Sequence, residues 1–118
     1  MIREKYLLAA GSPAFSKKLA ALFQSRGWQV EAITNKRNVS RLLMGMQIAP
    51  QYLVVDKLTD WIIQVSQQLH SQGTQIILSG WMTETPEELE RILGVPYYSI
   101  MGLPSKVASV LLGEQIVD

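Results

Sequence analysis

A regular alternation of short apolar runs and amphipathic segments constrains the fold of this chain more than any other feature. The segment after the first apolar run has Phe15, Leu19, Leu22 and Phe23 on one helical face. Each apolar run is short enough to be a strand buried on both faces of a sheet. The five runs are KYLLAA from residue 5, WQVEAI from residue 28, QYLVVD from residue 51, TQIILSG from residue 74 and PYYSIM from residue 96.

Turn and capping residues separate the strands from the helices. The clearest signal is Thr85 with Glu88, a capping box with Pro86 at the first helical position. Four residues are predicted to cap helices: Ser12, Asn38, Asp60 and Thr85. Five strands alternating with five helices through short loops predict a doubly wound parallel sheet in three layers, α/β/α.

Composition excludes several kinds of site. The chain has no cysteine, so disulfides and Cys-ligated zinc are excluded, and its one histidine, His70, argues against His-based metal sites and catalytic triads. No apolar run approaches the roughly 18 residues of a membrane span, and the first residues lack a signal-peptide pattern. We expect a cytoplasmic protein and one domain over residues 1–118, either free-standing or part of a longer chain.

The net charge of +1 hides a polarity along the chain. Residues 1–57 carry +6 and residues 58–118 carry −5. A basic half can bind nucleic acid, but charged residues of this kind more often form solvated faces. We therefore rank a nucleic-acid role last.

The carboxyl ends of the strands are where a doubly wound sheet places its functional residues. Asp56 ends the third apolar run, where a carboxylate can accept a phosphoryl group, hold Mg²⁺ or cap backbone N–H groups. The GSPAFSKK stretch after the first run has neither the glycine spacing nor the Gly-Lys pair of a phosphate-binding loop. His70 lies on a predicted helix surface, and no acid has the spacing of a catalytic triad with Ser79. We therefore expect that Ser79 is not a nucleophile.

Several segments resemble the receiver domains of bacterial response regulators, which have the flavodoxin-like (CheY-like) fold of two-component signalling. The resemblance covers nearly the whole chain. It implies that Asp56 occupies the phospho-acceptor position, and that Ser79 and Tyr98 occupy the switch positions. The segments that carry it are YLLAAGSPAFSKKLAALFQSRGWQV, YLVVD, QIILSG and YYSIMGLPSKVASVLL.

The chain departs from the family where the family binds magnesium. The acid pair falls on Ala10 and Gly11, and the lysine falls on Met101, or on Leu103 if Pro104 is the anchor. Without these groups, charge on a transferring phosphoryl group is not stabilised. The resemblance therefore predicts a degenerate pseudo-receiver that is no enzyme, has no cofactor and binds no Mg²⁺.

The analogy with receivers also predicts a protein-binding face on the fourth helix, fifth strand and fifth helix, and a homodimer through it. Tyr97 and Tyr98 must point to opposite faces of their strand, and Trp81 is a further contact candidate. The predicted interface residues are Glu87, Arg91, Tyr97, Tyr98, Lys106 and Val110. Two alternatives stay open: an atypical receiver phosphorylated at Asp56, and a flavodoxin-like module that binds a small ligand or nucleotide.

Overall fold

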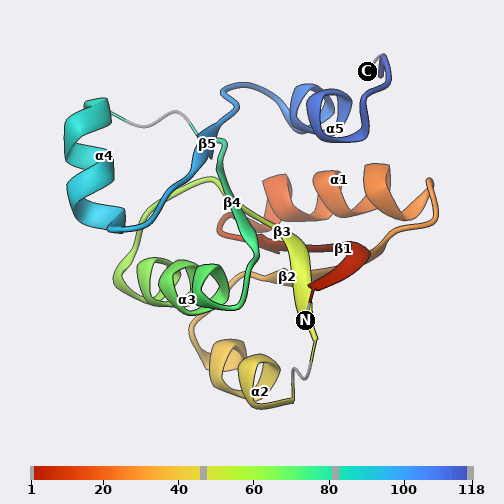
Figure 1. The fold of residues 1–118 in the computed structure, drawn as a ribbon. Coiled ribbons are helices and arrows are strands. Elements are labelled where there is room, and N and C mark those ends of the chain that lie inside the picture. Colours follow the sequence, from red (N-terminus) through yellow and green to blue (C-terminus); the bar gives the residue numbers. More distant parts are fainter. Residues whose placement is uncertain (1, 46–47, 81–82, 117–118) are drawn as a thin grey trace.

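The computed structural model describes residues 2–45, 48–80 and 83–116. Trp81, the further contact candidate, lies outside these ranges. Strands and helices alternate through the described chain, as the apolar pattern predicts (Figure 1). The elements are β1 (Ile2–Ala10), α1 (Pro13–Gln24), β2 (Gln29–Ile33), α2 (Arg37–Gly45), β3 (Ala49–Val55), α3 (Asp60–Ser71), β4 (Gln75–Leu78), α4 (Pro86–Leu93), β5 (Tyr98–Ser99) and α5 (Pro104–Leu112).

All strand pairs are parallel, and the order across the sheet is β2-β1-β3-β4-β5. The register aligns Ala10 with Val55 and Val55 with Leu78, so three central strands end at one level. Parallel strands need crossover connections, which the helices supply on both faces. The predicted doubly wound parallel sheet is confirmed.

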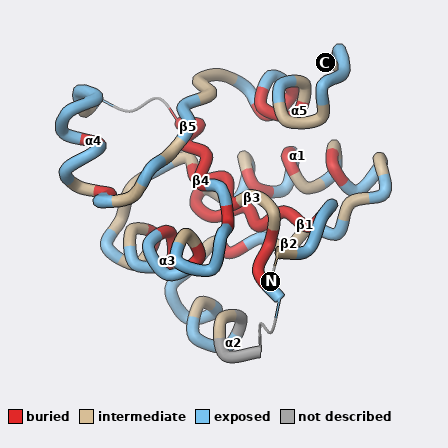
Figure 2. Tube along the Cα trace, viewed as in Figure 1, coloured by how far each residue is buried: buried red, intermediate tan, exposed pale blue. Residues whose placement is uncertain are grey.

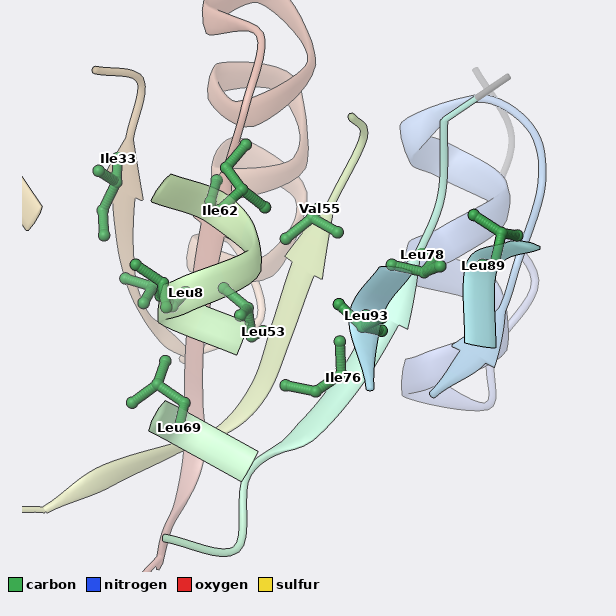
Figure 3. Close-up of a cluster of buried hydrophobic side chains, with 12 residues drawn as sticks. Leu8, Ile33, Leu53, Val55, Ile62, Leu69, Ile76, Leu78, Leu89 and Leu93 are labelled. Carbon is green, nitrogen blue, oxygen red and sulfur yellow. The ribbon is translucent and has the colours of Figure 1, made fainter. Parts of the chain in front are cut away.

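The helices divide into two layers. On one face, α3 and α4 bury Ile62, Leu69 and Leu93 against the strands, and α2 packs at the edge of this cluster (Figure 3). On the other face, α1 and α5 cover a second cluster that includes Phe23 and Val107. The most buried segments of the chain therefore run through the central strands (Figure 2).

The limits of two strands, β1 and β5, differ from the sequence-based expectation. β1 begins at Ile2 rather than residue 5, and a bulge between Arg3 and Leu7 places Lys5 at φ +57°. β5 was expected over residues 96–101 but pairs with β4 only at Tyr98 and Ser99. Pro96 has no N–H to donate to a ladder, which limits pairing at the start of this strand.

The helix starts agree with the sequence in part. The Thr85–Glu88 capping box is present, as predicted. Ser12 holds the N-cap position of α1, but its side chain makes no capping hydrogen bond. Thr59 rather than Asp60 holds the N-cap position of α3, without a side-chain capping bond, because α3 begins one residue earlier than predicted. Asn38 lies inside α2, which begins two residues earlier than a cap at Asn38 would place it.

Within the described ranges, no helix is both long enough and apolar enough to cross a membrane.

Candidate functional site

The carboxyl ends of β1, β3 and β4 are in register and bring three positions predicted from the sequence together at the carboxyl end of the sheet. Gly11 follows β1, Asp56 follows β3 and Ser79 follows β4. Because Ala10, Val55 and Leu78 are in register, these next residues begin their loops side by side. Ala10 itself is fully buried in the core and presents nothing polar.

The carboxylate of Asp56 is directed toward the end of β1. Its Oδ1 accepts a hydrogen bond from the backbone N–H of Ser12 at 3.0 Å. A Cβ atom at Gly11 would lie 1.8 Å from this oxygen, and Gly11 has a φ of +135°. The Asp56 carboxylate therefore occupies the space that a side chain at position 11 would need.

Gly80 brings the end of β4 close to the backbone of Asp56. A Cβ atom at Gly80 would lie 1.8 Å from the Asp56 carbonyl oxygen. The sequence alone did not identify this contact, although a glycine near the end of a buried strand is a typical sign of close backbone approach. Gly11 and Gly80, which have no side chain, leave room for Asp56 beside the ends of both neighbouring strands.

Ser79 is fully buried at the same edge. Its N–H donates to the carbonyl oxygen of Val55 at 2.8 Å, which continues the ladder beyond β4. Its Oγ is buried and has no hydrogen-bond partner among the described residues. A buried hydroxyl without a hydrogen-bond partner lowers the stability of the folded protein. A bound ligand or a local rearrangement that gave the Ser79 hydroxyl a partner would therefore be favoured.

The position predicted for the receiver lysine carries no cation. Met101 is half-buried, and Leu103 is exposed at the N-cap of α5. Lys106 lies in α5, as expected, and its Cδ would be 3.0 Å from a Cβ atom at Gly102. The lysine stem therefore lies over the turn that follows β5.

The residues at this edge do not fit Mg²⁺, the ion that the resemblance implies for such a site. Magnesium needs several oxygen ligands, and one or two carboxylates usually supply part of them. Asp56 supplies one carboxylate here, and its Oδ1 already accepts a hydrogen bond from the Ser12 N–H. Asp56 stands next to Ala10 and Gly11, which offer no side-chain oxygen.

The predicted interface residues lie around β5. Tyr97 packs against the α3–α4 cluster, whereas Tyr98 is 62% exposed, so the two rings point to opposite faces as expected. Val110 is exposed on α5, and Leu103 precedes it. These three exposed residues, with Ile48, are the large hydrophobic side chains that are exposed in the described chain. The charged members of the set, Glu87, Arg91 and Lys106, are also exposed.

Comparison with known proteins supports the fold and nothing finer. No protein-family model matches the chain, and no curated protein sequence does. Among solved structures, the chain is similar to the chemotaxis protein CheY4 of Vibrio cholerae, with a TM-score of 0.66 and 16% sequence identity. The similarity covers 92% of this chain and 96% of that chain. The chain therefore has the flavodoxin-like fold of CheY-like receivers.

Proposed function

We propose that this chain is a non-catalytic, receiver-like signalling module that acts by binding a protein partner and is not phosphorylated by the Mg²⁺-dependent route. The contact between Gly11 and Asp56 carries the proposal. The Asp56 carboxylate occupies the space that the side chain of a second acid at position 11 would need. This contact supports the part of the proposal that concerns phosphorylation. The part that concerns partner binding is supported by the fold and by the exposed residues around β5.

Phosphoryl transfer to Asp56 would lack its usual electrostatic support. The one carboxylate already accepts the Ser12 N–H, and the lysine position holds Met101. Each preorganised charge or donor of this kind contributes about 3 kcal/mol to the transition state. The loss of both the metal and the lysine would slow transfer by several orders of magnitude.

The surface around β5 supports a binding role. Tyr98 and Val110 are exposed and line the same hollow beside β5, and Leu103 is exposed at the start of α5. Contiguous exposed apolar area is a feature of interaction sites. Glu87 and Arg91 are exposed on α4 and Lys106 is exposed on α5, so the helices before and after β5 both carry exposed charge. Exposed apolar side chains accompanied by polar and charged ones are typical of protein–protein interfaces.

Incubation with Mg²⁺ and acetyl phosphate, followed by intact mass measurement, tests the proposal. We expect no added phosphoryl group on the wild-type chain. A receiver domain with a complete acid pair and lysine, run alongside, verifies that the donor is active. A wild-type mass increase that Asp56→Asn abolishes would overturn the proposal.

One observation favours the alternative of an atypical receiver phosphorylated at Asp56. The Ser79 hydroxyl is buried beside the end of β3 and lacks a partner among the described residues. A phosphoryl oxygen on Asp56 is the kind of acceptor that such a hydroxyl would satisfy. The same mass experiment decides between the two functions, and Ser79→Ala would then alter the lifetime of any phosphorylated species.

A further inference from the structure

β5 forms one outer edge of the sheet and leaves part of its backbone available. The strand order ends at β5, so no described strand lies beyond it. The N–H of Ile100 donates to the Leu78 carbonyl oxygen at 2.9 Å, toward β4. Successive N–H groups along a strand point to opposite edges, so the N–H of Ser99 points outward. An unpaired strand edge is a template for another strand.

A hollow flanks this edge on each face of the sheet. The hollow on the α5 side has a volume of about 380 Å³, and the hollow on the α4 side has a volume of about 710 Å³. Tyr98 and Ser99 line both of them. The edge strand therefore lies between two open spaces, where a typical buried strand would have packed helices.

The two hollows differ in chemistry. On the α5 side, Ile77, Ile100, Val110 and Leu111 provide an apolar lining. On the α4 side, Glu90 is the charged residue of a lining that otherwise consists of Gly94, Val95, Pro96, Tyr97, Tyr98 and Ser99. Glu87, Glu88 and Arg91 are exposed on α4 but do not line this hollow. The first hollow suits an aliphatic side chain, and the second suits a cationic one.

We propose that the β5 edge binds an extended segment of a partner protein as an added strand, with apolar and basic side chains in alternation. This inference rests on the proposed binding function and names the partner's chemistry. Alternate side chains of a strand point to opposite faces. An added strand would therefore place apolar residues in the α5-side hollow and basic residues beside Glu90, while Ser99 supplies backbone hydrogen bonds.

Charge argues against a second copy of this chain, the homodimer expected from the sequence, as the occupant. Two β5 edges that pair about a two-fold axis would run antiparallel and place both α4 helices side by side on one face. Each α4 carries Glu87, Glu88 and Glu90 against Arg91. Like charges brought together oppose this pairing, whereas a basic segment is attracted to it.

The first test is a titration of the isotope-labelled chain with the peptide Thr-Val-Arg-Leu-Arg-Val-Thr, followed by NMR. We expect amide shifts centred on residues 98–100 and slower hydrogen exchange there. The matched control peptide is Thr-Val-Glu-Leu-Glu-Val-Thr. We expect it to bind at least about tenfold more weakly, a difference that one well-placed charge pair supplies.

Three variants separate strand addition from simple groove binding. Ser99→Pro removes the outward N–H and is tolerated on an edge strand, and we expect it to lose peptide binding. Ser99→Ala keeps the N–H and serves as its matched control. Glu90→Lys should reverse the preference between the two peptides. Val110→Glu, at an exposed position, should weaken both peptides by placing a charge in the apolar hollow.

The outcomes are distinguishable from those of the phosphorylation experiment. Binding of the peptide elsewhere, or binding that Ser99→Pro and Glu90→Lys leave unchanged, would overturn the strand-addition proposal and leave the proposed function standing. Self-association in sedimentation experiments that Ser99→Pro abolishes and Ser99→Ala keeps would assign the edge to a second copy and also overturn it. Phosphorylation of Asp56 would contradict the proposed function without affecting the peptide result.

Discussion

At the scale of single residues, the absence of a side chain at Gly11 leaves the space that the Asp56 carboxylate fills. The φ of +135° at Gly11 is open to glycine and strained for other residues, and the Asp56 oxygen fills the space where a Cβ atom would stand. The sequence predicted both the strand-end position of Asp56 and the missing acid at position 11. It could not predict their contact, because the approach depends on the register between β1 and β3.

Gly11→Ala should therefore destabilise the protein by about 3 kcal/mol, from backbone strain together with the clash. Urea denaturation measures the change in the free energy of unfolding. Gly27→Ala is the matched control, since Gly27 has a φ of +82° with nothing within 4 Å of its Cβ position. It should cost only about 1–2 kcal/mol.

The clash component can be isolated in the Asp56→Ala background, which lacks the carboxylate. Gly11→Ala should cost clearly less there than in the wild-type chain, because only the backbone strain remains. Equal costs in the two backgrounds would contradict the role given to the Asp56 carboxylate.

Tyr6 provides a residue-scale prediction of pH dependence. Burial, with the charge and hydrogen bond of Glu31, raises the pKa of Tyr6 from 10.0 to about 12. The folded protein thus holds the phenol proton more tightly than the unfolded chain does. The resulting stability is fully present below pH 10 and is lost as the pH rises from 10 toward about 12.

Urea denaturation across this pH range, with wild type and Tyr6→Phe compared at each pH, measures this effect. The stability difference between the two chains should shrink by about 2 kcal/mol as the phenol ionises. Tyr6→Phe lacks the titrating group, so other groups that titrate in this range cancel in the comparison. A difference that stays constant with pH would contradict the raised pKa.

At the scale of elements, α4 shows how a helix can be specified locally. Thr85 Oγ1 accepts from the N–H of Glu88 at 3.2 Å, and the Glu88 carboxylate accepts from the N–H of Thr85 at 3.3 Å. Leu89 and Leu93 then attach the helix to the core. Because the whole capping box lies within four residues, the sequence predicted this helix start correctly.

Thr85→Ala should lower the free energy of unfolding by about 1 kcal/mol, the usual value of an N-cap. Amide hydrogen exchange in the first turn of α4 should speed up at the same time. Thr83→Ala, at an exposed position outside the helix, is the control and should change neither quantity. Unchanged exchange in α4 would show that the capping box contributes little.

Elements whose limits depend on distant neighbours were predicted less well. The apolar run at residues 96–101 has the residues of a strand, but its pairing partner β4 is only four residues long. Likewise, the Ser12 backbone is bonded to Asp56, 44 residues away, and its side chain makes no cap bond. Periodicity identifies an element, whereas its ends depend on contacts that the sequence does not display.

At the scale of the whole molecule, the fold separates charges that the sequence groups together. Lys17 and Lys18 are exposed on α1, whereas Arg37 and Arg41 are exposed on α2. These two helices cover opposite faces of the sheet (Figure 1). The +6 charge of residues 1–57 is therefore divided between two surfaces, an arrangement that a sequence count cannot reveal.

We expect no saturable binding of a labelled DNA duplex at physiological salt, measured by fluorescence anisotropy. Weak binding at low salt should fall steeply as salt rises, because it would come from released counterions alone. A Lys17→Gln/Lys18→Gln chain and an Arg37→Gln/Arg41→Gln chain should lose this weak binding to similar extents. Saturable binding at physiological salt that only one of the two pairs supports would point to a real nucleic-acid surface.

The contact between Gly11 and Asp56 also limits how this protein can change over evolution. A side chain introduced at position 11 would be strained at a φ of +135° and would require the Asp56 carboxylate to move, so an acid there has a cost in stability before it can contribute a ligand. Under the proposed function, the evolution of a metal-binding acid pair would begin with a loss of stability at the turn between β1 and α1, whereas most substitutions on the surface change stability little.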